Sequence, residues 1–175
     1  MIKANIQFES QLRKEIIELA IKQYHKKYQH GKMGPDTFDC AGFVWYVYNT
    51  ILGVNIFDDG IGLSKTTKIM TSRYGKLTIF DENSLKKELH LIKVGDILLF
   101  HRQSLNDSFP KPDNKYPGHC GIYLGNEKFI HASSRKKKII ITDFKKNNYW
   151  LSVLVGTKDI SYSFDDIIKE KEIRI

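Results

Sequence analysis

Cys40 is the residue of this sequence whose position best suits covalent chemistry. It follows Asp39, a residue type that caps helix N-termini, and it opens the apolar run Ala-Gly-Phe-Val-Trp-Tyr-Val-Tyr, which ends near Gly53. Free backbone amides and the positive end of the helix dipole favour a thiolate over a thiol at such a position. A nucleophilic thiolate is one interpretation; a small buried apolar side chain, as most free cysteines are, is the other.

Two histidines, His119 and His131, flank a predicted hairpin and can supply the base that a nucleophilic cysteine needs. Side chains alternate between the faces of a strand, so Cys120 faces away from His119 and is predicted to be a packing residue. If the loop comprises residues 125–127, His131 pairs with Gly121 and lies diagonal to His119 on the same face, at roughly 7–8 Å between backbone positions. A two-residue loop would put the histidines on opposite faces. Considered without Cys40, two hairpin histidines with structural partners are the simpler interpretation.

The elements that must position these residues are predicted to be two helices followed by short strands, an α+β arrangement. Ser10 is the predicted N-cap of the first helix and Asp39 that of the second, which is apolar on nearly every face and therefore buried. Helices are predicted over residues 10–29, 40–52 and 84–90, and strands over residues 97–100, 120–124, 128–132, 138–142 and 151–155.

The length of 175 residues suits one domain, which we predict over residues 1–157. A charged tail over residues 158–175 is predicted to follow, with a peripheral helix as one option. A long polar loop, residues 101–118, is typical of a functional or mobile segment.

The net charge of +8 favours an anionic partner such as a wall polymer, although a merely solvated basic surface explains it equally well. No basic motif interleaved with aromatic residues suggests nucleic acid, and no apolar run reaches the length of a membrane span. The two cysteines form no CxxC pair and no zinc-like spacing, so no metal and no cofactor is expected. The first residues of the sequence show no secretory signal pattern. This suggests a cytoplasmic protein, a protein exported by another route, or an exported protein whose signal was removed.

Three segments resemble motifs of the NlpC-type cell-wall cysteine peptidases, bacterial relatives of papain. The first joins Tyr28, Gly31 and Pro35 to Phe-Asp-Cys-Ala-Gly-Phe-Val at residues 38–44, where the family has Phe-Asp-Cys-Ser-Gly-Leu-Val. The second is Val-Gly-Asp-Ile-Leu-Leu-Phe at residues 94–100. The third is Gly-His-Cys-Gly-Ile-Tyr-Leu-Gly at residues 118–125, followed by Phe-Ile-His-Ala. The three occur in the family's order.

The resemblance implies a papain-like fold in which N-terminal helices, one of them bearing Cys40, pack on an antiparallel sheet. It implies Cys40 as nucleophile, His119 as base and His131 as the group that orients the base. It also implies an oxyanion hole near the start of the Cys40 helix.

The resemblance further implies that Tyr28, Asp39, Ala41 and Gly118 belong to the substrate site. Family members commonly cut peptidoglycan stem peptides, often between D-γ-glutamate and a diamino acid, and many recognise a free N-terminal L-alanine. A peptidoglycan peptide or muropeptide is therefore the implied substrate. Ala41 departs from the family's serine, which often helps to bind the amine end of the substrate.

Two other functions stay open. A papain-like amidase, deamidase or acyltransferase acting on a protein or lipid would use the same cysteine and histidine. A non-catalytic module could use the positive charge to hold an anionic polymer, but it would have no need of the Cys/His/His set.

Overall fold

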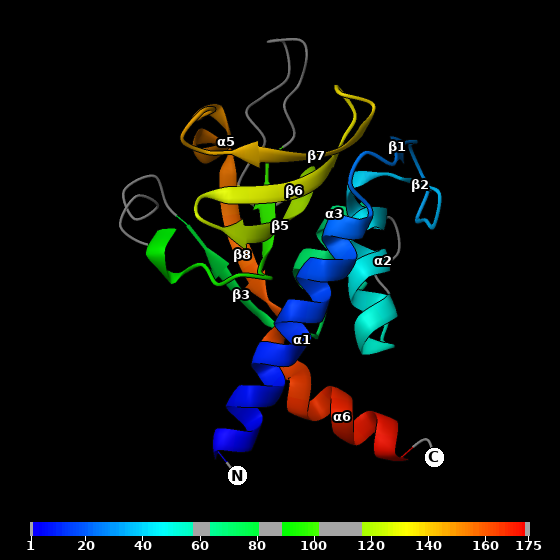
Figure 1. Ribbon diagram of the computed structural model, residues 1–175, viewed down its shortest axis with the longest axis vertical. Coiled ribbons are helices and arrows are strands. Elements are labelled where there is room, and N and C mark those ends of the chain that lie inside the picture. The colour runs from blue at the N-terminus through cyan, green and yellow to red at the C-terminus, as the bar shows by residue number, and fades with distance from the viewer. Residues whose placement is uncertain (1, 58–63, 81–88, 102–116, 174–175) are drawn as a thin grey trace.

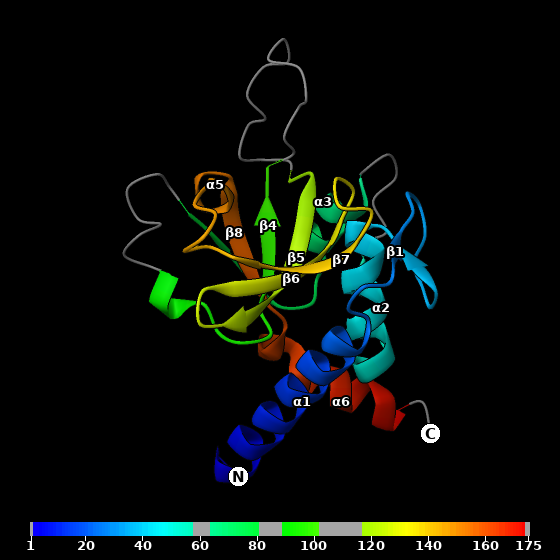
Figure 2. The same cartoon turned by 45° about the horizontal axis from the view of Figure 1, so that its top comes forward.

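The computed structural model describes residues 2–57, 64–80, 89–101 and 117–173, which form one curled β-sheet with helices packed against it (Figures 1 and 2). The eight strands run in the order β2–β1–β7–β6–β5–β4–β8–β3, and each neighbouring pair is antiparallel except β1 with β2. The predicted α+β class is confirmed. The strands are β1 (Lys27–Tyr28), β2 (Thr37–Phe38), β3 (Lys76–Ile79), β4 (Ile97–Phe100), β5 (His119–Gly125), β6 (Lys128–Ser133), β7 (Lys138–Asp143) and β8 (Leu154–Asp159).

Helices of different lengths accompany the sheet. The longest is α1, and α2 is the helix that begins at Cys40. The helical segments are α1 (Ile2–Lys22), α2 (Cys40–Leu52), α3 (Lys65–Thr71), α5 (Tyr149–Ser152) and α6 (Phe164–Ile173), with 3-10 turns at Leu89–Leu91 and Ile160–Ser163. Among the described residues, no helix is both long enough and apolar enough to cross a bilayer.

Helix α2 has the limits predicted from its sequence. The Asp39 side chain accepts a hydrogen bond from the Gly42 amide, and Gly53 ends the helix in the left-handed region with φ of 66°. Seven of its 13 residues are buried, as expected of a helix with apolar side chains on most faces. Local signals at both ends therefore place Cys40 at the first position of a buried helix.

The predicted limits of the first helix are wrong. Helix α1 begins at Ile2, and Ser10 lies in its interior, because the residues before Ser10 include strong helix formers and neither glycine nor proline, and a serine alone does not start a helix. It ends at Lys22, before the left-handed residue His25, and the chain then enters strand β1. Ile16 of this helix is buried in the core.

The sheet separates two apolar clusters. One face packs against α1, α2 and α6, with contributions such as Ile16, Val44 and Ile167. The other face gathers large aromatic side chains, including Phe100 and Phe129, beneath α5. Cys120 belongs to the first cluster and is fully buried.

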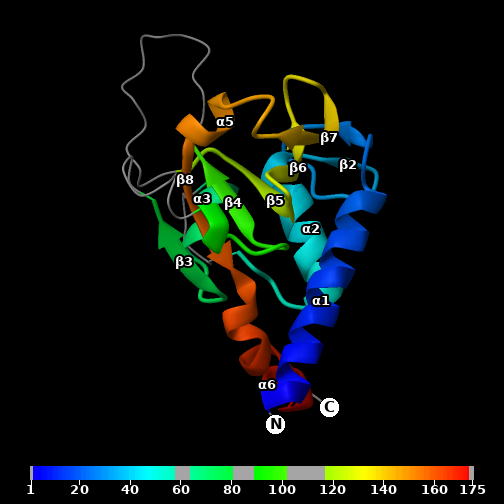
Figure 3. The ribbon, with the colours of Figure 1, turned by 60° about the vertical axis from the view of Figure 1, so that its left-hand side comes forward.

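The C-terminal part differs from the sequence prediction. Residues 149–152 form the short helix α5, and β8 starts at Leu154, three residues later than the predicted strand. Strand β8 runs through the predicted domain boundary between residues 157 and 158, and α6 follows it at the end of the molecule away from α5 (Figure 3). The loop 101–118 and the helix predicted over residues 84–90 lie mostly outside the described residues.

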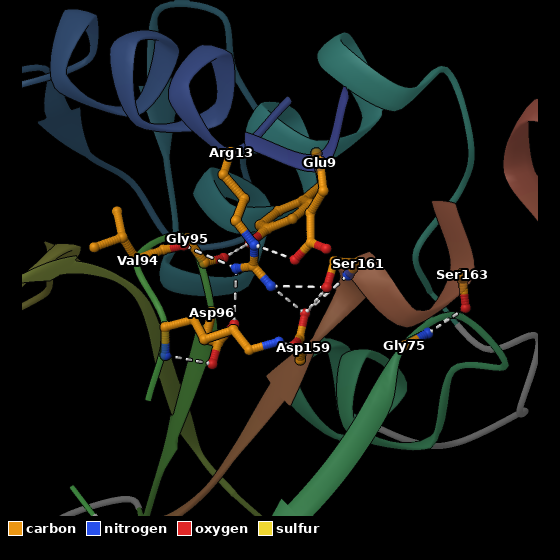
Figure 4. Close-up of polar contacts among 11 residues, drawn as sticks. Glu9, Arg13, Gly75, Val94, Gly95, Asp96, Asp159, Ser161 and Ser163 are labelled. Carbon is orange, nitrogen blue, oxygen red and sulfur yellow. Dashed lines mark hydrogen bonds and ion pairs between the residues drawn. The ribbon is translucent and has the colours of Figure 1, made fainter. Parts of the chain in front are cut away.

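A cluster of charged side chains fastens α1 to the sheet (Figure 4). The Arg13 guanidinium lies 3.0 Å from Asp96 and 2.5 Å from Asp159, and it also donates to the Ser161 hydroxyl. The more exposed Lys93 forms a second ion pair with Asp159, at 3.0 Å between Nζ and Oδ2. The cluster joins residues 13, 96 and 159, far apart in sequence, beside the start of β4.

Candidate active site

The site begins with the cap of α2. Asp39 is almost fully buried; its Oδ1 atom accepts from the Gly42 amide at 2.6 Å, and its Oδ2 atom accepts from the Gly31 amide at 3.0 Å. Gly42 is required there, because a Cβ atom at that position would lie 2.2 Å from the Lys32 carbonyl oxygen. The loop before β2 is thus held tightly against the first turn of α2, next to Cys40.

The Cys40 thiol is half-buried at the first position of α2. Its pKa lies well below the usual value for cysteine, because Cys120, His119 and the Ala41 amide hydrogen-bond to the sulfur and the charge of His119 adds to this, against the opposing effect of burial. Burial, followed by the proximity of Cys40, raises the pKa of the Cys120 thiol well above its usual range. Of the two sulfur atoms, Cys40 is therefore the one that ionises, and Cys120 stays a thiol that can donate its S–H.

The two hairpin histidines meet as predicted. His119 Nε2 and His131 Nδ1 are 2.8 Å apart, and the rings are nearly perpendicular. His131 is fully buried, and its Nε2 atom lies 2.9 Å from the hydroxyl of Thr142 on the neighbouring strand β7. The result is a hydrogen-bonded row of His119, His131 and Thr142.

The loop of this hairpin is not the predicted one. Two residues, Asn126 and Glu127, form the turn with positive φ angles, and Gly125 pairs with Lys128. A β-bulge compensates: Tyr123 pairs with Phe129, so Leu124 is the extra residue. The bulge restores the register that a two-residue loop would otherwise shift, and both histidines stay on one face.

Burial, and then the charge of His119, lowers the pKa of His131 well below its usual value. A neutral His131 has one ring proton and one free lone pair. If His119 is an imidazolium beside a Cys40 thiolate, its Nε2–H donates to Nδ1 of His131, and Nε2–H of His131 donates to Thr142. This arrangement leaves Nδ1 of His119 for Cys40.

Aromatic rings surround the imidazole pair. Trp150 of α5 lies with its ring centroid 5.3 Å from that of His119 and 4.9 Å from that of His131. Phe129 stacks on His131 at 4.7 Å, and Phe100 contacts His119 at 5.9 Å. These contacts restrict both rings and exclude water from His131.

Of the four residues assigned to substrate binding by resemblance, Asp39 and Ala41 directly flank Cys40. Tyr28 pairs with Phe38 in the parallel pair β1–β2, one residue before Asp39. Ala41 is buried, and Gly118 directly precedes His119 and donates its amide to the Phe100 carbonyl. Their roles toward a substrate stay predictions.

Three residues at the site were not predicted from sequence. Trp150 lies just before the strand predicted over residues 151–155, in a segment without a predicted element, and Thr142 ends the strand predicted over residues 138–142, with no predicted role of its own. Lys65, from α3, forms an ion pair with Asp39 at 3.0 Å. Strand alternation could have indicated Thr142, because it is a polar residue at an alternate position of strand β7, directly after three isoleucines. Nothing near Lys65 in the sequence links it to Asp39. In the described part of the chain, no group of three or more His, Cys, Asp or Glu side chains has an arrangement that could hold a metal ion.

Known proteins share this arrangement of elements. The model of the NlpC/P60 family matches residues 25–159. "Probable endopeptidase YafL" of Escherichia coli K12 is 31% identical over 150 residues, 83% of this chain and 50% of that protein. "Gamma-DL-glutamyl hydrolase" of Bacillus subtilis is 29% identical over 131 residues, 74% of this chain and 24% of that protein. This chain therefore spans half or less of the length of these two relatives.

Solved structures agree with the sequence comparison. NlpC1 from Trichomonas vaginalis superimposes with a TM-score of 0.59 and 26% identity, over 85% of this chain and 44% of that one. The papain-like fold is therefore confirmed, and the residues 25–159 matched by the family model include both the cysteine helix and the hairpin histidines. The chain belongs to the NlpC/P60 family.

Proposed function

We propose that this protein is a cysteine hydrolase that cleaves amide bonds in peptidoglycan stem peptides. The observation that supports this most directly is the row Cys40, His119, His131 and Thr142, in which the thiol has a depressed pKa and the base is oriented by a buried neutral imidazole. The named endopeptidase and hydrolase activities of the relatives agree with it. A glutamyl–diamino acid bond, the bond type of many family members, is the specific target that we propose.

The proposed reaction follows from the positions of the groups. The Cys40 thiolate attacks the amide carbon, and the carbonyl oxygen becomes an oxyanion near the first amides of α2. The His119 imidazolium then gives its proton to the leaving amine, and a thioester to Cys40 forms. Water, deprotonated by the now neutral His119, attacks the thioester, releases the carboxylic acid and regenerates the thiolate–imidazolium pair.

His131 and Thr142 act through His119 in this mechanism. The neutral His131 accepts from the imidazolium, which fixes its tautomer and the direction of its proton toward Cys40. They are positioning residues, since neither touches the sulfur.

A second candidate is acyl transfer or deamidation on a protein or lipid. Ala41 supports this candidate, because its side chain offers no hydroxyl beside Cys40 to bind a peptide amine. The chemistry up to the thioester is the same, and only the acceptor or substrate differs.

The deciding experiment is digestion of purified muropeptides with product analysis by mass spectrometry. We expect one amide bond to be cut and Cys40→Ala to lower turnover at least about ten-thousandfold. Cys120→Val is the comparison variant, since it keeps the nucleophile but removes a hydrogen-bond donor to its sulfur; it should cost far less turnover than Cys40→Ala and should raise the pKa of the Cys40 thiol. A wild-type protein that cleaves no stem peptide, yet forms a thioester with another acyl donor, would favour the second candidate.

An anionic wall polymer is a further proposed partner. Basic side chains gather where β1 meets β7: Lys27 pairs with Lys138, and the preceding turn carries the exposed residues Arg135, Lys136 and Lys137. Such a cluster binds polyanions in a salt-dependent way. Replacing these three exposed residues by glutamine should weaken sedimentation with the polymer at low salt, without slowing cleavage of a small peptide.

A further inference from the structure

The two cysteines of the sequence meet beside the reactive histidines. Cys40 opens α2 and Cys120 lies on β5, and these two elements pack against each other (Figures 2 and 3). Cys120 is fully buried in the core, and the half-buried Cys40 packs against the same apolar cluster. Both are free thiols, and a hydrogen bond joins their side chains.

The two sulfur atoms differ in ionisation and in access to solvent. The hydrogen bond from Cys120 is the largest cause of the low pKa of Cys40, whereas burial is the largest cause of the raised pKa of Cys120. An accessible thiolate reacts with oxidants much faster than a buried thiol does. Cys40 is therefore the sulfur that an oxidant attacks first, and Cys120 is a protonated thiol in contact with it.

The proposed hydrolysis gives Cys120 no covalent step, since it only donates a hydrogen bond to the Cys40 sulfur. A second sulfur differs from any other donor at this place because it can also form a bond to an oxidised cysteine. A hydrogen bond from the buried Thr66 hydroxyl acts against the raised pKa of Cys120, so it would stabilise this sulfur as its proton leaves.

We propose that Cys40 and Cys120 are a redox modification site, in which a peroxide oxidises Cys40 and Cys120 then closes a reversible disulfide with it. The inference goes beyond amide hydrolysis; it rests on the reactivity proposed for Cys40 and on no particular substrate. The disulfide occupies the nucleophile, so the oxidised protein is inactive until a thiol reductant opens the bond. It also protects Cys40 from irreversible oxidation to the sulfinic acid.

The reaction balances with hydrogen peroxide as the oxidant. The Cys40 thiolate attacks one peroxide oxygen, the O–O bond breaks, and the leaving hydroxide takes the proton of the His119 imidazolium to form water. Cys40 is then a sulfenic acid. The Cys120 sulfur attacks the Cys40 sulfur, the S–O bond breaks, and the hydroxyl group leaves with the Cys120 proton as a second water. A dithiol reverses the modification by exchange and is itself oxidised to a disulfide.

The first test exposes the dilute purified protein to hydrogen peroxide and follows its mass. We expect the intact protein to lose two hydrogen atoms, and we expect the unreduced digest to contain the Cys40 peptide joined to the Cys120 peptide. Dithiothreitol should return both thiols. The proposal is overturned if oxygen atoms are added to Cys40 with no joined peptide, or if Cys40 joins only Cys40 of a second molecule.

Cys120→Ser separates disulfide formation from the hydrogen bond to Cys40. Serine can still donate to the Cys40 sulfur but cannot form the disulfide, so Cys40 should proceed to the sulfinic acid. At equal extents of Cys40 oxidation, the fraction of Cys40 thiol recovered with dithiothreitol should be at least about fivefold lower than in the wild type. Cys120→Val gives the same comparison without a buried hydroxyl. Recovery equal to that of the wild type in both variants would overturn the proposal.

Cys40→Ala tests the order of the two steps. Without the thiolate, the buried Cys120 should stay a free thiol under the same exposure, and its oxidation at the wild-type rate would contradict the proposed order. These readouts need no turnover. A reversible disulfide in a protein that cleaves no stem peptide would remove the hydrolase proposal and leave the modification site, whereas cleavage without any joined peptide would do the reverse.

Discussion

Two polar clusters occupy opposite ends of the same pair of strands, and they are built from different kinds of groups. Asp96 directly precedes β4, whereas His119 begins β5 and pairs with Phe100 at the other end of β4. The Asp96 end holds Arg13 and Asp159 in an ion-paired cluster (Figure 4). The His119 end holds a thiol, two imidazoles and a hydroxyl.

The charges in the ion-paired cluster are permanent near neutral pH. Hydrogen bonds from Ser161 and the charges of Arg13 and Lys93 outweigh burial and lower the pKa of Asp159. Burial raises the pKa of Asp96 to about 6, with the charge of Asp159 adding to the effect, so it too is ionised at neutral pH. Tyr48 adds a hydrogen bond to the Gly95 carbonyl, which fixes the backbone beside Asp96.

The charges in the reactive cluster arise only when a proton moves from one member to another. Its members carry no charge before this transfer. The depressed pKa of Cys40 favours the release of the thiol proton to His119. A polar cluster thus stabilises a fold when its charges are fixed and paired, and serves chemistry when its charges can move. Substitutions in the two clusters should therefore differ in their effects on stability and on rate.

After the loss of the nucleophile itself, the largest expected effect is the loss of rate in His119→Gln. Glutamine keeps the size and polarity of the side chain but cannot exchange a proton, so kcat/KM should fall at least about a thousandfold. The pKa of the Cys40 thiol should rise, because the hydrogen bond and charge of His119 disappear. Steady-state kinetics and ultraviolet titration of the thiolate measure the two effects.

The matched expectation for this variant is a nearly unchanged free energy of unfolding. Urea denaturation of His119→Gln should give a value within about 1 kcal/mol of the wild type, since His119 is only half-buried. A large loss of stability with a small loss of rate would mean that this cluster, too, is a structural one.

The next largest effect is on stability, in Arg13→Met. Removal of the guanidinium leaves two largely buried carboxylates without their main partner, and we expect a loss of about 3 kcal/mol in the free energy of unfolding. Urea denaturation measures it. The kcat/KM of the folded fraction should stay within about twofold of the wild type, because the cluster lies at the far end of β4 and β5.

Lys14→Met is the control for this variant. Lys14 is the next residue of α1, and its pair with Glu18 is exposed at 3.9 Å, so its removal should cost less than about 0.5 kcal/mol. If Arg13→Met were no more costly than Lys14→Met, the ion-paired cluster would not brace α1 against the sheet.

These two clusters also differ in how much of them the sequence predicts. Cys40 and helix α2 follow from Asp39 and Gly53, which act on their immediate neighbours. The meeting of the histidines follows from strand alternation, although the β-bulge at Leu124 was needed to keep them on one face. Local rules thus predict the reactive groups.

The supporting contacts are not predictable in this way, because they join distant parts of the chain. Arg13 meets Asp159 across 146 positions, and Lys65 reaches Asp39 across 26. Trp150 covers the imidazoles only because residues 149–152 form a helical turn, which overlaps the start of the strand that β-rich composition predicted over residues 151–155. Such contacts depend on the register and the packing of elements, which one sequence does not determine through local propensity.

A third prediction concerns the pH dependence of stability. The folded protein holds His131 neutral, with a pKa well below the unfolded value of about 6.5. As pH falls below about 6.5, the unfolded state takes up a proton that the folded state refuses, and the free energy of unfolding should fall by up to about 1.4 kcal/mol per pH unit. Above this pH the contribution is fully present.

His131→Asn isolates this contribution. Asp96 acts in the opposite direction, since its raised pKa costs stability as pH rises through about 6. The Asp96 contribution is common to both proteins and cancels in the difference between wild type and variant. Urea denaturation at a series of pH values should therefore show a shallower acid decline for His131→Asn, and identical slopes would contradict a buried neutral His131.

The smallest expected effect is in Thr142→Val. Thr142 is the last member of the row of Cys40, His119, His131 and Thr142, which we call the reactive row. Valine has the shape of threonine without the hydroxyl, so His131 loses the partner of its Nε2 atom at 2.9 Å. Because Thr142 acts through two imidazoles, kcat/KM should fall only about threefold. Thr142→Ser keeps the hydroxyl and should restore the wild-type rate if the hydrogen bond matters.

A pH profile separates this role from simple packing. Without the hydroxyl, His131 no longer needs its proton on Nε2 and can place it on Nδ1, where it repels the imidazolium of His119. The acid limb of kcat/KM, which reports the thiolate–imidazolium pair, should then move to a different pH in Thr142→Val and stay in place in Thr142→Ser. A uniform loss of rate at every pH in both variants would mean that Thr142 only fills space, and the reactive row would end at His131.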